Sequence, residues 1–439
     1  MWAVMLRSMR ALRAACCLLV VLAALFAATA GRPVRAQVDS GGYCLIPMDP
    51  GQADHLRAYG VAYWCLQQGF KVEWLLNFRG GAFLAPDSKL LQVQARLLGV
   101  SIEIIGADQR EEILKSMDKG NFEVVLLEKA PKVAIYTPPD KRPWDDAVTL
   151  ALTYAKIPYE TLWDKDVLAG KLADCDWLHL HHEDFTGQYG KFYATFHNAP
   201  WYQEQVKMYT TMAKEAGFAK VQQHKCEVAK GIKTFVLNGG FLFAMCSATD
   251  TIDVALAAEG IDIVPPEIDG DGQDPAADSK LDFTKTFAFT NFTLIPSAFI
   301  YEFSNIDVSN YQNVSQPELE DFTLFEFSAK IDPVESMLTQ CHTNEVKGFF
   351  GQTTSFNKDV IKKGVRVLAE VPNQNRAKLI HGNLGKGTFT FYGGHDPEDF
   401  SHAVGDPPTD LSLHKNSPGY RLILNNILFP AAKKKKLKT

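Results

Sequence analysis

The segment from Gly239 to Ala248 has the composition of a strand that presents a reactive cysteine. It reads Gly-Gly-Phe-Leu-Phe-Ala-Met-Cys-Ser-Ala, so an apolar strand runs into Cys246 and a helix is expected directly after it. Ala244 and Ala248 are small, as a nucleophile elbow requires, because larger side chains clash in so tight a turn. A helix N-terminus also favours the thiolate. Cys246 is therefore a candidate nucleophile, with a buried strand-end cysteine as the structural alternative.

A second candidate group follows the strand expected at 387–392. That strand ends in Gly393, Gly394 and His395, and the two glycines leave space around the imidazole. A general base that faces a substrate needs such space, and a carboxylate commonly orients its ring. We predict that His395 is the base and that Glu398 or Asp396 orients it. Gly393, Gly394 and Asp396 are also expected to line the substrate site. A helix cap with an incidental histidine is the alternative.

Histidines and carboxylates cluster after the buried strand expected at 177–181. His179 and His181 share one face of that strand, because side chains alternate along it. With His182, Glu183 and His395 they have the chemistry of a zinc site. Histidine pairs on strands are more often hydrogen-bonded core groups, so we predict no metal and no cofactor. The position after a parallel strand also suits substrate binding. The residues assigned to substrate binding here are His181, His182, Glu183 and Asp184.

Alternating strand and helix patterns predict the elements that position these residues. Residues 41–130 are expected to form a smaller N-terminal α/β domain, and residues 131–430 a larger one. Val133–Tyr136 is a short, continuous apolar run, which is typical of a strand buried on both faces. Alternation of such strands with helices predicts a parallel sheet covered on both sides.

The pattern changes between about residues 260 and 354. Acidic turns and aromatic strand-like pieces, such as Thr284–Phe289 and Phe322–Phe327, predict a β-rich insertion. The sheet is expected to resume at Val365–Val371 and Gly387–Tyr392. Ser417 followed by Pro418 has the pattern of a helix start, because serine caps the first turn and proline fits the first helical position.

The first 36 residues have the pattern of a cleavable secretory signal. Three arginines precede an uncharged apolar run from Ala14 to Ala30, and small residues follow. Cleavage is expected after Ala30 or Ala36. The sequence therefore predicts export to the periplasm or the extracellular space, with no integral membrane segment after cleavage. A retained anchor is the alternative.

Charge and cysteine content restrict the partners. The formal net charge is −6, and loss of the three leader arginines would make it −9. Phosphate binding needs a basic face, so nucleic acid is not an expected partner. The basic tail at 431–439 is expected to be a solvated end. The six cysteines outside the leader are widely spaced without a CxxC motif, which excludes a zinc-finger framework. The expected partner is a small-molecule ligand.

Three segments together resemble the class I glutamine amidotransferase-like fold. They are Lys132–Tyr136, the Cys246 turn, and the Gly-Lys-Gly strand that runs into Gly394-His395-Asp396. The similarity is closest to the ThuA-like branch, and it implies a flavodoxin-like domain with a Cys-His-Glu triad. That triad carries over to Cys246, His395 and Glu398. Here alanines flank the cysteine in place of glycines, and two residues separate the histidine from the glutamate in place of one.

The chain outside the leader also resembles exported bacterial proteins labelled asparagine synthetase B. The stretches that carry this similarity are Cys44–Asp49, Leu178–Tyr189 and Gly405–Asp410. The label implies glutamine-dependent amide synthesis with ATP. Such synthetases need an N-terminal cysteine and a Ser-Gly-Gly-x-Asp-Ser loop for pyrophosphate, and this sequence contains no such loop.

Three functions follow from these patterns. The first is a cysteine-dependent amide hydrolase or amidotransferase-like enzyme that acts on a small molecule or carbohydrate derivative. The second is a ligand-binding envelope protein that keeps only the scaffold. The third is the glutamine-hydrolysing synthetase that the label implies. Fold alone does not choose among them, because function resides in the site.

We predict that the purified protein forms no asparagine from aspartate, glutamine and ATP, because the pyrophosphate loop is missing. Chromatographic measurement of asparagine tests this. Turnover above background that a single point substitution abolishes would contradict it.

Overall fold

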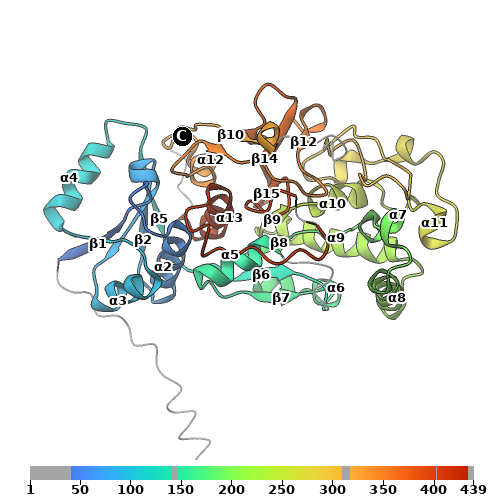
Figure 1. The fold of residues 1–439 in the computed structure, drawn as a ribbon, viewed down its shortest axis with the longest axis horizontal. Helices are drawn as coiled ribbons and strands as arrows, with labels where there is room; N and C mark the ends of the chain where they lie inside the picture. Colours follow the sequence, from blue (N-terminus) through green and yellow to red (C-terminus); the bar gives the residue numbers. More distant parts are fainter. Residues whose placement is uncertain (1–40, 140–145, 309–316, 402, 434–439) are drawn as a thin grey trace, which may run out of the picture. The chain divides into compact units, whose positions relative to one another are not determined.

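Two β-sheets organise the computed structural model of this chain (Figure 1). It describes residues 41–139, 146–308, 317–401 and 403–433. The predicted signal and its cleavage sites lie outside the described residues, as does the tail from residue 434. Both sheets belong to one compact unit, residues 39–439. The chain leaves the first sheet at Leu127, the end of its last strand, and enters the second sheet at Val133.

The first sheet has five strands in the order β4-β1-β3-β2-β5, and every pair in it is antiparallel. Its strands are β1 (Gly42–Ile46), β2 (Val72–Leu76), β3 (Ala82–Pro86), β4 (Glu103–Gly106) and β5 (Glu123–Leu127). Three helices accompany them: α2 (His55–Gln67), α3 (Lys89–Leu98) and α4 (Ala107–Met117). Asp54 and Ser88 begin α2 and α3 by accepting backbone N–H bonds of the first turn.

The second sheet has a parallel half, which confirms the predicted α/β class. Its strands lie in the order β7-β6-β8-β9-β15, and all four neighbouring pairs are parallel. They are β6 (Val133–Tyr136), β7 (Glu160–Leu162), β8 (Trp177–Leu180), β9 (Phe241–Met245) and β15 (Gly387–Tyr392). Every residue of β6 and β8 is buried, as expected for strands covered on both faces.

Helices cover both sides of these parallel strands. Figure 1 shows α5 and α13 on one side and α9 and α10 on the other. The helices of this half are α5 (Ala147–Ala155), α6 (Asp164–Leu168), α7 (Tyr193–Phe196), α8 (Pro200–Glu215), α9 (Val221–Leu237), α10 (Ala248–Ala257) and α13 (Pro418–Leu428). Ser417 caps α13 and Pro418 is its first residue, as predicted.

Helix α13 connects the two sheets. It packs against both α2 and α5. Its Arg421 is fully buried and donates to the carbonyl oxygens of Met48 and Gly80, at 3.0 and 2.8 Å. Asn425 accepts a hydrogen bond of 2.5 Å from the Tyr59 hydroxyl. These buried polar contacts fix the first sheet against the helices of the second.

Antiparallel strands extend the second sheet beyond β15. Strand β14 (Arg376–Leu384) pairs with β15, and three further strands follow β14 in the sheet. One more short strand also pairs with β14. These four are β13 (Arg366–Glu370), β10 (Phe322–Leu324), β11 (Glu345–Val346) and β12 (Phe356–Asn357). The sheet resumes at β13 and β15, as predicted.

The predicted β-rich insertion is wrong for most of its described residues. Between 260 and 354 the described strands are β10 and β11, alongside short helices that include α11 (Pro266–Asp269) and α12 (Pro333–Leu338). Residues Thr284–Phe289 form no strand, because the backbone N–H groups of Phe287, Ala288 and Phe289 donate to the carboxylate of Asp253. Their aromatic rings fill the core rather than one face of a strand.

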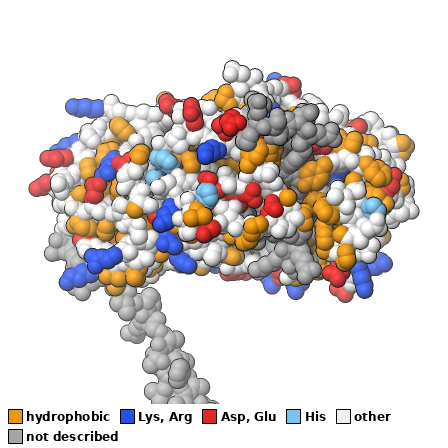
Figure 2. Space-filling model, in the orientation of Figure 1, with side chains coloured by type: hydrophobic (Ala, Val, Ile, Leu, Met, Phe, Trp, Pro, Cys, Tyr) orange, Lys and Arg blue, Asp and Glu red, His pale blue; other side chains and the backbone are white. Residues whose placement is uncertain are grey.

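Two further features concern membrane crossing and the distribution of surface charge. Among the described residues, no helix combines the length and apolar character that crossing a membrane requires. On the face drawn in Figure 2, acidic and basic side chains are interspersed rather than separated by sign.

We predict that His381 on β14 makes the fold sensitive to acid. Its Nδ1 lies 2.9 Å from the Thr390 hydroxyl, and burial lowers its pKa from 6.5 to about 4. As the pH falls, His381 takes up a proton in the unfolded chain before it does so in the folded protein. The contribution of the neutral, buried His381 to the free energy of unfolding is therefore complete above pH 6.5 and is lost as the pH falls toward 4. Between pH 6.5 and about 4, H381Q should lose about 1.4 kcal/mol less unfolding free energy per pH unit than the wild type. Urea unfolding at several pH values measures this, and equal slopes for both proteins would contradict it.

Candidate functional site

Cys246 occupies a strained turn between β9 and α10. Its φ is +50°, a left-handed conformation that non-glycine residues rarely adopt. The Cys246 N–H donates to the Gly394 carbonyl oxygen at 3.1 Å, and its own carbonyl accepts from the Thr249 N–H at 3.1 Å. Strain of this kind persists only where the surroundings hold it, and it concentrates at functional sites. The local geometry is that of a nucleophile elbow.

The thiol of Cys246 is buried and protonated at neutral pH. Its residue is 3% exposed, and burial raises the pKa of the thiol to about 12. Backbone N–H groups of Gln352, Ser247 and Thr353 act in the opposite direction, and the Gln352 N–H lies 3.3 Å from Sγ. The expectation that the helix end would hold a thiolate is therefore wrong, because desolvation outweighs the amide dipoles. Any nucleophilic step needs a base.

His395 reaches the same region from the end of β15. Its backbone N–H donates to the Phe350 carbonyl oxygen at 2.7 Å. Gly394 precedes it with φ +98°, and a Cβ there would lie 2.4 Å from the Phe349 ring. Glycine is required at 394 because no side chain fits and the conformation is left-handed. The two glycines thus allow close backbone packing rather than open space for a substrate; Gly393 lies against the Thr354 backbone.

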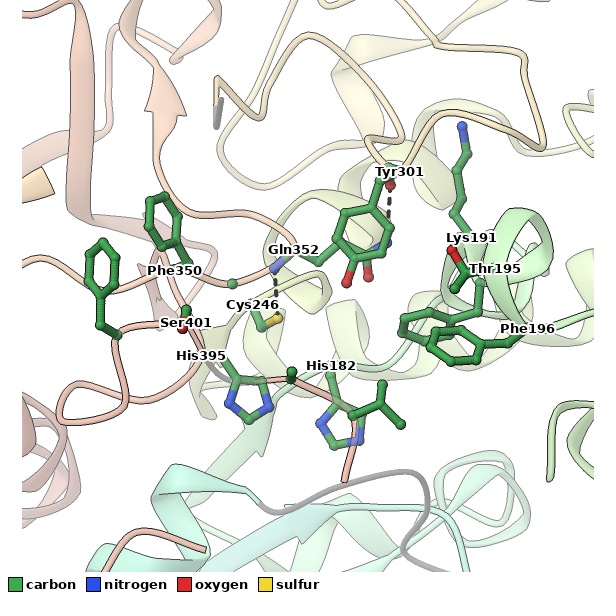
Figure 3. A pocket seen from close by; sticks show the side chains of 15 residues that line it. His182, Lys191, Thr195, Phe196, Cys246, Tyr301, Phe350, Gln352, His395 and Ser401 are labelled. Carbon is green, nitrogen blue, oxygen red and sulfur yellow. Dashed lines mark hydrogen bonds between the residues drawn. The ribbon is translucent and has the colours of Figure 1, made fainter. Parts of the chain in front are cut away.

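Cys246, His395 and His182 line one cavity of about 410 Å³ (Figure 3). Aromatic side chains form much of the remaining wall: Phe192, Phe196, Tyr301, Phe350 and Phe400. The volume lies within the range of small-molecule sites. Lys191 contributes beside them, and its Nζ donates to the carbonyl oxygens of Ile295 and Glu302 at 2.6 and 2.8 Å. Lys191 therefore holds the segment that carries Tyr301.

Two residues of the predicted histidine cluster, together with a carboxylate, form a buried chain behind the cavity. Asp146 Oδ2 lies 3.2 Å from His179 Nε2, and its Oδ1 lies 3.7 Å from His181 Nδ1. Although burial raises the pKa of Asp146, the two imidazoles lower it below its ordinary value. The His181 and His395 rings meet edge to face with centroids 4.3 Å apart. The structure therefore brings His181, His182 and His395 together.

The two carboxylates expected to orient His395 have other partners. Glu398 Oε2 lies 2.9 Å from His414 Nδ1. Asp396 accepts hydrogen bonds of 2.8 Å from both the Tyr420 and Thr409 hydroxyls. The geometry thus pairs Glu398 with the partly exposed His414 and gives Asp396 a structural role in fixing α13. The described contacts supply neither of them as a third triad member.

Glu183 and Asp184 organise the loop after β8. Glu183 accepts the His181 N–H at 2.8 Å, and burial raises the pKa of its carboxyl to about 8. Asp184 accepts the N–H groups of Thr186, Gln188 and Gly190, although burial raises its pKa. Both carboxylates are therefore used within the loop rather than directed at a ligand. His182 is the member of this predicted set that lines the cavity.

Sequence reasoning missed three kinds of site residue. Asp146 has the sequence pattern of a helix cap, and it does cap α5 by accepting the N–H groups of Val148 and Thr149. Nothing in the sequence around Asp146 indicates its contacts with His179 and His181. Gln352 contacts Sγ through its backbone N–H, which any residue except proline would provide, and its side chain donates to the carbonyl oxygens of Gly190 and Tyr301. The aromatic wall comes from four separate segments, and a run of phenylalanines indicates core as readily as cavity.

Comparisons with known proteins identify no family. No family model matches the sequence, and no curated protein matches it. Cytoplasmic proteins STM3548 of Salmonella typhimurium and STM1381 of Salmonella typhimurium LT2 align with 69% of this chain and 100% of theirs. Their identities are 12% and 14%, each with a TM-score of 0.34. The GH42 β-galactosidase Gan42B aligns over 61% of this chain and 28% of its own, at 10% identity and a TM-score of 0.27. Similarity at this level carries no argument about function.

We predict that Asp396→Ala destabilises the protein more than Glu398→Ala. Removing the Asp396 carboxylate leaves the buried Tyr420 hydroxyl without its acceptor, which should cost about 1–3 kcal/mol. Glu398→Ala removes a partly exposed contact with His414 and should cost less than about 1 kcal/mol. Urea unfolding of both variants measures the difference, and equal losses would contradict the structural role of Asp396.

Proposed function

We propose that this protein is a cysteine-dependent amide hydrolase built on a flavodoxin-like, class I glutamine amidotransferase-like domain. Numbered along the chain, the five parallel strands lie in the order 2-1-3-4-5, which is the flavodoxin-like order. Ligands in such sheets bind at the carboxyl ends of the strands. Cys246 and His395 follow the carboxyl ends of two neighbouring strands, β9 and β15.

The conformation of Cys246 carries the proposal. A buried cysteine that served only as packing would not need a φ of +50° or a cavity in front of it. The elbow turns the cysteine out of the strand, and the Gly394 carbonyl oxygen holds the turn from the neighbouring strand end. This contact supports the proposal that His395, which directly follows Gly394, serves as the base for Cys246.

The proposed reaction passes through an acyl-enzyme. His395 takes the thiol proton as Sγ attacks the amide carbonyl carbon, because the protonated thiol is a weak nucleophile. The imidazolium then gives that proton to the leaving nitrogen as the C–N bond breaks, which leaves a thioester. Water, deprotonated by His395, attacks the thioester and releases a carboxylic acid. The thiolate recovers its proton from the imidazolium.

The cavity wall restricts the substrate. Aromatic side chains dominate it, and Lys191 is committed to backbone carbonyl groups. Such a wall suits a small amide with an apolar face, such as an aryl amide or an N-acyl sugar, whose ring can pack on aromatic side chains. Export through the N-terminal signal is part of the proposal and rests on the sequence.

Burial of the thiol favours a second candidate, a non-catalytic ligand-binding protein that uses the same cavity. A pKa of about 12 and an exposure of 3% are those of an unreactive structural cysteine. In this function His395 and His182 would donate or accept hydrogen bonds to a ligand without proton transfer in a reaction. Turnover separates the two candidates.

We predict that the purified protein hydrolyses at least one compound in a panel of glutamine, small aryl amides and N-acetylated sugars. Release of ammonia, amine or acid measures the reaction. C246S should abolish it, and H395N should reduce it by roughly 10²–10⁴-fold, the usual contribution of a general base. C341S, which changes a partly exposed cysteine away from this cavity, is the matched control and should retain activity. Binding of panel compounds without turnover would favour the binding protein, and turnover that survives C246S would refute the thiol mechanism.

A further inference from the structure

Three imidazoles converge at the edge of the cavity. His181, His182 and His395 each offer a ring nitrogen, and the three nitrogens all lie within 4.8 Å of one another. Ring centroids are 4.3 Å apart for His181 and His395, 5.4 Å for His181 and His182, and 6.0 Å for His182 and His395. The first two follow β8 and the third follows β15, so two loops that flank β9 build the cluster.

A carboxylate and a second imidazole lie behind the innermost imidazole of the cluster. His181 is fully buried, and its Nδ1 faces Asp146 Oδ1 at 3.7 Å and His179 Nε2 at 3.3 Å. The lone pairs of the two imidazole nitrogens point in divergent directions, so Nε2 of His181 is directed away from Asp146. A carboxylate behind a histidine is the usual outer partner of a metal ligand, because it fixes the ring and increases its basicity.

The donor set indicates the class of metal. Three imidazole nitrogens without a carboxylate in the cluster suit zinc and related divalent transition metals, whereas magnesium and calcium prefer oxygen. His182 and His395 line the cavity, so a fourth coordination position would face the space that a ligand enters. Three protein ligands with one open position is the arrangement of a catalytic rather than a structural zinc site.

Although the sequence alone predicts no metal, we propose from this geometry that His181, His182 and His395 bind one divalent metal ion of the zinc class, with Asp146 as the outer partner of His181. The site goes beyond the proposed hydrolase and shares one residue with it. A ring nitrogen of His395 that is bound to metal cannot accept a proton from the Cys246 thiol. Metal binding therefore opposes the thiol reaction. This competition rests on the proposed function, whereas the metal site itself does not.

The test measures binding of Zn²⁺ alone to the purified full chain, by competition with a chromophoric chelator and by metal analysis after dialysis. One equivalent should bind to the wild type. H182A, which changes the half-buried ligand and leaves the buried pair intact, should weaken binding by more than about 100-fold, and D146N by about 10–100-fold. H414A alters a histidine paired with Glu398 and should bind like the wild type. Co²⁺ should give a visible spectrum in the wild type that H182A loses.

The outcomes separate the metal site from the hydrolase. Equal Zn²⁺ affinity in the wild type and H182A, or no bound equivalent in the wild type, overturns the metal site whatever the activity. A bound equivalent lost in H182A supports it even if no amide is hydrolysed. Where turnover is found, Zn²⁺ should inhibit the wild type and a chelator should restore it; inhibition undiminished in H182A would contradict the competition for His395.

Discussion

One backbone hydrogen bond joins the two halves of the candidate site. The N–H of Cys246 donates to the carbonyl oxygen of Gly394, and each residue lies just after a strand of the parallel sheet in a left-handed conformation. The bond forms only because β9 and β15 pair in register up to Met245 and Tyr392. Sheet pairing therefore determines where the cysteine and the histidine segments meet.

Burial then decides the chemistry available there. The same dense packing that holds Cys246 in a strained turn removes water from its sulfur and raises the pKa of the thiol. A thiol in this environment reacts only when a base removes its proton during the attack. In the function that we propose, His395 supplies that base when its ring is metal-free, and in the proposed metal site the same ring is a ligand. The two proposals therefore share one imidazole, that of His395, which lines the cavity with Cys246.

Short-range patterns predicted the centre of the larger sheet. Apolar runs locate β6, β8, β9 and β15, and the small residues around Cys246 indicate the turn that follows β9. The partners of the carboxylates could not be predicted, because they join segments far apart in sequence. Asp146 reaches His181, Glu398 reaches His414, and the Asp253 carboxylate replaces the strand pairing expected at Thr284–Phe289. When a side chain such as that of Asp253 takes backbone N–H groups that a strand would otherwise use, the hydrophobic periodicity of the sequence does not change, so the sequence gives no sign of it.

The most direct measurement of the central claim is the site of alkylation by a small aryl chloroacetamide at neutral pH, followed by mass spectrometry. Cooperation of Cys246 with His395 predicts one adduct, on Cys246, that forms at least about 10-fold more slowly in H395N. Five other cysteines of the described chain are free thiols and serve as internal controls: Cys44, Cys65, Cys175, Cys226 and Cys341. Labelling that occurs first at the partly exposed Cys341, or a Cys246 rate unchanged in H395N, would contradict the account.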